Sequence, residues 1–454
     1  MQQYQISSLG FLPESCVKEL PSSFQHFSSL LDHLSSPDTL KFRQCVHSLP
    51  PYDPNLYSIN GLSRGQKQYL YSIITMIIQK YLWGEGTSTP IDLVPTELGA
   101  PLLELAQELG LQPALTYAGV IMYNWSLRDN TKPISLDNLK VNHKLREGAP
   151  YEWFCMIHAA IEAAGGKTII PIFNIQRNIE ENNIEAIKGT LKLVNEAIKA
   201  CNVILFRMYE NCSPDEFWNF RYYFEGTNDT NFFPKGLRIK GFEDRPIVVR
   251  GASGGQSTLM QIFDALFAVE HIGHGKGFLE EMRSYMPKDH QKFLQDFIKG
   301  TNLRKYVERI NNEELTKVFL EGVDNFTIYR QGHYKIAHDY IFRMIQKDQI
   351  DVSVQKPESE KGLYKENETG TGGTNAPKFL QQTIQETKAT RNIRLCGEEL
   401  MQEKKIEEKS DKKYEKEKNN KMTIKFKFDQ RKLEDVLFSL IVAFAGSYLV
   451  RFLL

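Results

Sequence analysis

The stretch Phe326–Ile345, with the sequence FTIYRQGHYKIAHDYIFRMI, decides the fold class of this chain. Its apolar residues return every three or four positions, which is the period of an α-helix with one buried face. Strands with alternating polar and apolar residues are scarce in the sequence, so it predicts a mostly α protein. Further helical runs are expected over residues 65–83, 102–125, 151–164, 178–211, 256–271, 277–285 and 288–299. Within 102–125, we expect Gly110 to end the run of apolar residues that begins at Leu102.

The composition limits the classes of function to consider. The 454 residues are enough for two domains, and 41% of them are hydrophobic. Lys+Arg and Asp+Glu both number 56, and a net charge of zero argues against a nucleic-acid-binding protein. The six cysteines have no C-x-x-C spacing, so we expect neither a disulfide scaffold nor a thiolate zinc site. The first residues lack the pattern of a secretory signal, which favours an intracellular setting.

Changes in composition divide the chain into five predicted segments. They are a small N-terminal helical domain, a connector, a large helical domain, a charged tether and a C-terminal single helix, over residues 1–127, 128–149, 150–396, 397–430 and 431–454. The large domain includes a polar, Gly/Thr-rich loop at 346–377 that we expect to be mobile. The tether has too few apolar residues to fold by itself.

The C-terminal segment has the length of a membrane span. Val436–Leu454 comprises 19 residues, which as a helix reach about 28 Å, close to the ~30 Å of a bilayer's hydrocarbon core. Basic residues at positions 425, 427, 431 and 432 precede it, as expected for the cytosolic side. We therefore expect a tail anchor at the cytoplasmic face of an intracellular membrane. A helix that docks on a partner protein is the alternative.

His333 is the histidine whose position most favours a function. It lies on the apolar face of the Phe326–Ile345 helix, one turn from Arg330, and both side chains need partners when buried. A metal together with an anionic ligand would satisfy both, whereas a core histidine bonded to a backbone carbonyl is the alternative. Asp264 also lies in an apolar run, and we expect Arg330 to be its partner.

Two other histidines lead to different predictions. His158 shares an apolar helix face with Phe154, on a helix that we expect to end at Gly165-Gly166. His290 follows a proline among polar neighbours, so we expect it on the surface. The motifs of common hydrolases and of the P-loop are absent from the sequence.

Six motifs, in order, resemble the indoleamine 2,3-dioxygenase family. The resemblance covers roughly residues 50–390, and the order and spacing of the motifs make it specific. The motifs are YAGVIMYNW (117–125), FWNFR (217–221), RGASGGQSTLMQIFD (250–264), FLEEMRSYMP (278–287), YRQGH (329–333) and GTGGT (370–374).

This resemblance implies an all-α haem enzyme with a small domain over a large haem-binding domain. Its cofactor would be haem b, and it would add O₂ to L-tryptophan, giving N-formyl-L-kynurenine, the first step of the kynurenine pathway. His333 would be the proximal iron ligand, and Arg330, supported by Asp264, would meet a haem propionate. The resemblance also implies a cellular reductant for ferric haem. We expect a monomer.

The resemblance assigns the substrate side as well. Arg221 would bind the substrate carboxylate, and Thr371 would lie in the loop that closes over the substrate. Ser253 and Gly254 would line the distal side of the haem. The apolar walls around the indole would be formed by Tyr117, Val120, Ile121, Phe154 and Phe217.

His158 departs from the family pattern, because many members have serine at this position. The related tryptophan dioxygenases use a distal histidine at the indole N–H, so His158 is expected to bond the substrate there; a ring that only fills space is the alternative. We take His158 and Ser253 as the catalytic candidates. The competing function is a haem protein that binds O₂ or senses redox state without turning over tryptophan. Arg221, Phe217 and the GTGGT loop favour the enzyme, because an O₂ carrier needs no amino-acid site.

Overall fold

The structure is a computed structural model that describes residues 1–55, 57–84, 90–228, 232–347 and 376–393. These residues are mainly helical, which confirms the predicted fold class. Their strands form two two-stranded sheets: β1 (Leu93–Val94) pairs in parallel with β4 (Arg238–Ile239), and β2 (Trp125–Leu127) pairs antiparallel with β3 (Leu139–Val141).

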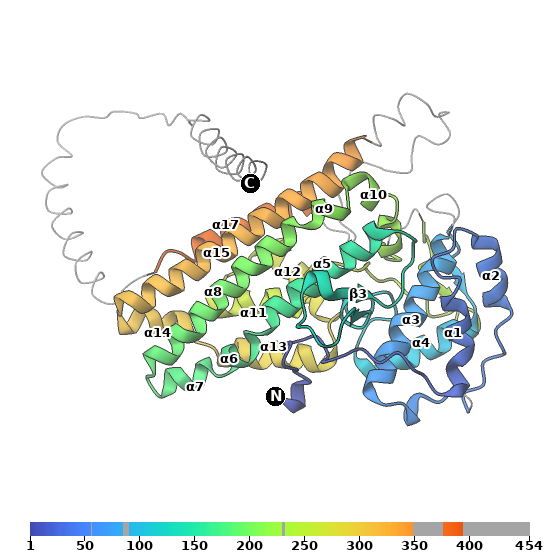
Figure 1. Cartoon of the computed structure of the whole chain (residues 1–454), viewed down its shortest axis with the longest axis horizontal. Helices are drawn as coiled ribbons and strands as arrows, with labels where there is room; N and C mark the ends of the chain where they lie inside the picture. Colours follow the sequence, from blue (N-terminus) through green and yellow to red (C-terminus); the bar gives the residue numbers. More distant parts are fainter. Residues whose placement is uncertain (56, 85–89, 229–231, 348–375, 394–454) are drawn as a thin grey trace, which may run out of the picture. The chain divides into compact units, whose positions relative to one another are not determined.

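Two long helices form the centre of the larger helical body. They are α8 (Ile184–Phe206) and α15 (Glu313–Ala337), which run side by side (Figure 1). Each begins at an asparagine whose side chain accepts a hydrogen bond from a first-turn amide, so both starts are capped. The cap at Asn312 explains why α15 begins earlier than the apolar stripe suggested. The chain stays helical beyond α15 through the π-helical turn η8 (His338–Phe342).

Three further helices pack around this pair and complete the site region. α5 (Ala149–Gly166) packs on α8, α17 (Ala376–Ala389) packs on α15, and α11 (Thr258–Phe267) contacts both α5 and α15. The remaining helices of this body are α6 (Ile169–Phe173), α7 (Ile175–Glu180), α9 (Met208–Asn211), α10 (Pro214–Trp218), α12 (Gly273–Arg283), α13 (Lys288–Gly300) and α14 (Leu303–Ile310), with 3₁₀ turns η5 (Leu136–Asn138), η6 (Arg221–Phe224) and η7 (Gly254–Gln256).

The first helices gather around α3 (Arg64–Trp83), as predicted for 65–83 (Figure 1). Every residue of α3 from Tyr69 onward is buried. The others are α1 (Gln25–Leu31), α2 (Thr39–His47) and α4 (Thr96–Leu109), with 3₁₀ turns η2 (Ser22–Phe24) and η3 (Ile59–Gly61), whereas the 3₁₀ turn η1 (Gln2–Tyr4) packs on α13. Met1–Cys396 groups as one compact unit, so a boundary between a 1–127 domain and a 150–396 domain stays a prediction.

Several helix predictions were wrong in their bounds. Gly110 ends the apolar run as predicted, as a left-handed cap with φ +66°, but the helix does not go on to residue 125, and the chain resumes as the π-helical turn η4 (Ala118–Met122). The run 178–211 is broken at Asn182, which has φ +52°. α5 does not stop before Gly165-Gly166 but includes both glycines. Gly166 packs against the Leu9 carbonyl, where a Cβ would lie 2.0 Å from the oxygen.

The surface prediction for His290 was also wrong. Its side chain is only 3% exposed, and its ring lies 4.9 Å from that of Phe11. The N-terminal segment covers this face of α13, which a local sequence pattern does not reveal. Burial lowers the pKa of His290 to about 3.

No helix within the described ranges is both long and apolar enough to cross a bilayer. The predicted tether and anchor lie outside those ranges, as do Thr371 and most of the 346–377 loop. The ends of that loop are helical: Gln346 and Lys347 continue from η8, and Ala376 opens α17.

Candidate functional site

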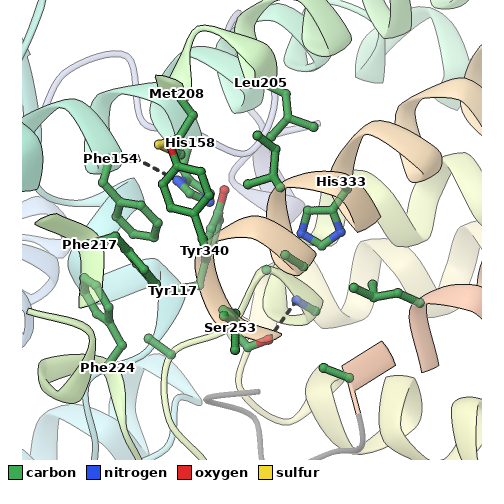
Figure 2. Close-up of a pocket in the computed structure, with 18 of the residues that line it drawn as sticks. Tyr117, Phe154, His158, Leu205, Met208, Phe217, Phe224, Ser253, His333 and Tyr340 are labelled. Carbon is green, nitrogen blue, oxygen red and sulfur yellow. Dashed lines mark hydrogen bonds between the residues drawn. The ribbon is translucent and has the colours of Figure 1, made fainter. Parts of the chain in front are cut away.

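A cavity of ≈ 180 Å³ brings together most of the predicted site residues. It lies between α5, η4, α15, α17 and the Gly251–Ser257 segment (Figure 2). Of the predicted residues, those that line it are Tyr117, Val120, Ile121, Phe154, His158, Phe217, Ser253, Gly254 and His333. These positions come from five separate parts of the chain, so the cavity is a product of the tertiary fold.

His333 faces the cavity from α15, opposite the aromatic side chains (Figure 2). No described residue makes a hydrogen bond to its ring, so the alternative of a core histidine bonded to a backbone carbonyl is wrong. Burial, with smaller effects of His158 and Arg330, lowers the pKa of His333 to about 4. The imidazole is therefore neutral near pH 7, and a neutral ring nitrogen is the form that binds a metal.

His158 lies on α5 with one ring nitrogen already occupied. Its Nδ1 is 2.8 Å from the carbonyl oxygen of Phe154. Because a carbonyl only accepts, Nδ1 carries the proton and donates, which leaves Nε2 as an acceptor. Burial lowers the pKa of His158, so the ring is neutral. His158 thus adds one hydrogen-bond acceptor to an otherwise apolar wall.

That wall is a group of stacked and tilted rings. The Phe154 ring lies 5.0 Å from Phe217 and 5.3 Å from Phe224, and Phe217 lies 5.8 Å from Tyr340. Rings packed at these spacings form one continuous aromatic surface, against which a flat aromatic ligand can pack. Sequence reasoning assigned no site role to Phe224 or Tyr340. Tyr340 had a signal, since it lies on the same apolar stripe as His333, two turns along.

Three further segments of the cavity lining also went unpredicted. Leu205 and Met208 come from the end of α8 and the start of α9, and Phe278 comes from α12. From α17, which follows the Gly/Thr-rich segment, come Ala376, Phe379 and Leu380. No sequence pattern tied α17 to the site, because its apolar residues are few.

A buried cluster of charges lies beside His333. The Arg330 guanidinium is 2.5 Å from Asp264, as predicted, and donates to the Thr383 carbonyl at 3.1 Å. His271, which was not predicted, has its ring nitrogens 3.1 Å from Asp264 and 2.6 Å from Glu386. Arg330, Asp264 and His333 line a second cavity of ≈ 80 Å³ that shares Gly254, Gly255, Phe379 and Leu380 with the first.

Opposite charges decide the protonation of this cluster. Burial raises the pKa of Asp264, but Arg330 and His271 outweigh it and hold that pKa below its ordinary value. Burial likewise lowers the pKa of His271, and the hydrogen bond and charge of Asp264 outweigh it, so that pKa is raised. The cluster is a mixed set of charges that links α11, α15 and α17.

Two predicted substrate residues are not placed at the cavity. Arg221 does not line it; its guanidinium is 2.7 Å from Glu225 and lies over the Trp218 ring at 5.2 Å. Thr371 lies outside the described residues. Their roles stay predictions. Ser253 lines the cavity, and its hydroxyl accepts a hydrogen bond from the Gly255 amide at 3.3 Å.

The donor set fits a haem. Within the described ranges, no group of three or more His, Cys, Asp or Glu side chains gathers to hold a bare metal ion. One neutral imidazole facing an apolar cavity suits the axial position of a haem iron. An arginine beside it, with a side chain that is 12% exposed, suits a propionate. His333 and Arg330 are therefore the residues able to hold this cofactor.

Comparison with known proteins extends the resemblance to the N-terminus. The family model described as indoleamine 2,3-dioxygenase matches residues 1–390. Indoleamine 2,3-dioxygenase 1 from Rattus norvegicus is 28% identical, covering 86% of this chain and 95% of its own length. The protein of the same name from Mus musculus is 28% identical over 82% and 91%. A myoglobin from Haliotis madaka is 29% identical over 85% and 97%. Because the family model spans most of the sequence, the chain belongs to the indoleamine 2,3-dioxygenase family.

Proposed function

We propose that this protein is a haem dioxygenase that cleaves the C2–C3 bond of the indole ring of L-tryptophan. Both atoms of O₂ enter the product, N-formyl-L-kynurenine. The observation that carries the proposal is the cavity itself, with a neutral imidazole free of protein partners on one side and an aromatic wall with one acceptor on the other. Membership of the family supports the same reaction.

His333 and Arg330 are the residues proposed to hold the haem. His333 would bind the haem iron through a ring nitrogen, and Arg330, kept in place by Asp264, would bind a propionate. When bound, the haem supplies the iron at which O₂ is activated. The protein's part is to orient the substrate and to exclude water.

The aromatic wall is proposed to hold the indole. Tyr117, Val120, Ile121, Phe154 and Phe217 offer apolar surface to both faces of a flat ring. The acceptor at Nε2 of His158 matches the indole N–H, which is a donor. We propose that this bond makes the site selective for tryptophan over ring-nitrogen-methylated analogues.

The amino-acid end of the substrate is proposed to meet Arg221, Ser253, Gly254 and Thr371. A guanidinium binds a carboxylate with two parallel hydrogen bonds. Since Arg221 lies 2.7 Å from Glu225, it would have to exchange this carboxylate for that of the substrate. Binding would therefore involve a rearrangement around η6.

A second function has a specific observation in its favour. The Haliotis madaka relative is named a myoglobin although it is as similar to this chain as the dioxygenases are. A protein named a myoglobin is thus similar to this chain over most of its length, and fold alone does not decide between O₂ binding and tryptophan turnover. Reversible O₂ binding without tryptophan turnover is the rival.

One experiment separates these functions. The purified haem protein is reduced without air, mixed with L-tryptophan and then with O₂, and the absorbance of formylkynurenine is followed. The proposal predicts repeated turnover when reductant is present. Reversible oxygenation without product would favour the rival.

We also propose that residues 1–127 and 150–396 are separate domains.

We further propose that residues 431–454 anchor the protein to an intracellular membrane. To test the anchor, cells expressing the full chain and a version ending at Asp435 can be fractionated. The full chain is expected in the membrane pellet, where alkaline carbonate does not extract it, and the shortened chain in the supernatant. A full chain that carbonate releases would contradict the anchor.

A further inference from the structure

A buried carboxylate lies directly behind the aromatic wall. Glu162 is on α5, one turn after His158, and is only 2% exposed. No ion pair joins it to any residue that the structure describes. Buried carboxylates without a cation are rare, because burial strongly disfavours the charged form. The function proposed above gives Glu162 no role.

Glu162 connects two walls of the cavity. The Tyr117 hydroxyl donates to its Oε1 at 3.1 Å, and the Ser257 hydroxyl donates to the same oxygen at 2.5 Å. Tyr117 belongs to one wall, and Ser257 ends the Gly251–Ser257 segment whose Ser253 and Gly254 form another. A single carboxylate oxygen therefore sets the distance between these walls.

A second residue completes the link between the same two segments. The backbone amide of Tyr117 donates to the side-chain oxygen of Gln256 at 2.8 Å, and the Gln256 amide donates to the Gly251 carbonyl at 2.8 Å. The Glu162 and Gln256 contacts are parallel, but only that of Glu162 involves a group that titrates.

Among the residues that the structure describes, no other group around Glu162 changes charge near pH 7. Besides Tyr117, the titratable groups facing it are Cys201 on α8 and Tyr329 on α15. Burial raises the pKa of Cys201 to about 12 and raises that of both tyrosines, so all three stay neutral. Burial also raises the pKa of Glu162 to about 7, against the smaller effects of Ser257 and Tyr117.

We propose that Glu162 is a positioning residue, which through Tyr117 and Ser257 holds two walls of the cavity together and whose protonation state sets how tightly an indole ligand binds. The proposal rests on the proposed function for the identity of the ligand. The ionised carboxylate accepts two charge-assisted hydrogen bonds, which are stronger than those accepted by the neutral acid. The walls are therefore held more firmly when the proton is lost.

This arrangement gives ligand binding and stability opposite dependences on pH. The folded-state pKa lies above the ordinary value of 4.5, so the folded protein loses stability from this group as pH rises from 4.5 to about 7. Over the upper part of the same range, binding tightens. A residue that only filled space would produce neither effect.

The test compares wild type with Glu162→Gln, which keeps an acceptor oxygen but has no charge at any pH. L-Tryptophan is titrated into the haem-loaded full chain between pH 5.5 and 8.5, with the Soret band as the readout. For wild type, Kd is expected to fall on the order of five-fold as pH rises through about 7. For Glu162→Gln, Kd is expected to stay near the weaker, low-pH value. Ionisation of the ligand or of the haem changes Kd equally in both proteins, so the difference between their pH profiles reports Glu162.

The thermal unfolding midpoint gives a readout that does not need the ligand. The unfolding midpoint of Glu162→Gln minus that of wild type is expected to increase by on the order of 3 °C from pH 5 to pH 8. Glu196→Gln, which removes an exposed carboxylate of α8 that pairs with Lys199, is the matched control and should show neither effect. If Glu162→Gln does not fold, Tyr117→Phe, which keeps the ring and removes the donor, should lessen the pH dependence of Kd.

The outcomes separate this proposal from the proposed function. Parallel pH profiles of Kd for wild type and Glu162→Gln would overturn the positioning role even if tryptophan is turned over normally. If tryptophan does not bind wild type at any pH, the proposed function fails, and the ligand-binding part of this proposal fails with it. The pH-dependent difference in unfolding midpoint between Glu162→Gln and wild type would then still show whether Glu162 ionises in the folded protein.

Discussion

His333 and His158 face the same cavity and are both neutral, but they differ in what holds their rings. The Nδ1 of His158 is bonded to the Phe154 carbonyl, which fixes the tautomer and leaves one acceptor. The ring of His333 has no bond to any described residue, so both nitrogens remain available. An imidazole fixed in one tautomer is suited to accept a hydrogen bond from an N–H group, whereas a ring with both nitrogens available is suited to bind a metal.

The largest expected effect comes from removing the free ring. His333→Ala should abolish stoichiometric haem binding, because no other described side chain of the cavity offers an axial ligand on that side. Haem content and the Soret band report this loss, and added imidazole should partly restore both. His338→Ala, five residues on and exposed, is the control. A normal ferric Soret band in His333→Ala would remove His333 from the role of ligand.

The second prediction concerns Arg221, which is proposed to bind the carboxylate of a substrate held on the His158 side of the cavity. Arg221→Ala should weaken tryptophan binding by about 2–4 kcal/mol while leaving haem content unchanged, since a charge-assisted contact is lost. A spectral titration measures the change, with the exposed Arg177→Ala of α7 as the control. Unchanged KM and kcat would show that Arg221 stays with Glu225 and does not bind substrate.

His271 differs from His333 and His158 because it lies between two carboxylates, Asp264 and Glu386. The pKa of His271 is raised, so its stabilising contribution is complete below its ordinary value of 6.5 and is lost as pH rises through the folded-state pKa. His271→Gln should therefore lower the free energy of unfolding by about 1.5–3 kcal/mol at pH 6 and by less at pH 9. Denaturant titrations at both values measure it. An equal loss at both pH values would mean that the ring contributes no charge.

The smallest effect is expected for His158. His158→Ala should reduce the preference for tryptophan over 1-methyl-tryptophan by roughly five-fold, because it removes one acceptor worth about 1 kcal/mol. Haem content should not change. The ratio of kcat/KM for the two substrates is the readout, and an unchanged ratio would favour the alternative in which the ring only fills space.

The sequence predicted the burial of a site residue correctly wherever that burial follows from the periodicity of a single helix. Periodicity placed His333 and His158 on buried faces, and the need of a buried carboxylate for a cation paired Asp264 with Arg330. It failed where the partner is distant along the chain. His290 is buried by an N-terminal segment, and one of the two carboxylates bound to His271 is Glu386, 115 residues away.

Bounds failed for a related reason. The glycine pair at the end of α5 suggested a cap, but Gly166 is required by the close approach of Leu9. Glu162 lay within a predicted helix, yet nothing local showed that its neighbours would be hydroxyls and not cations. The pKa of a buried carboxylate depends on whether its neighbours are hydroxyls or cations, and the tertiary structure determines which they are.

Whether this cavity adds O₂ to tryptophan is tested by a single turnover of the reduced haem protein with L-tryptophan and ¹⁸O₂, followed by mass spectrometry of the product. We expect N-formylkynurenine in which both added oxygen atoms carry the label. Oxygenated protein with unchanged tryptophan, or product without the label, would contradict this expectation.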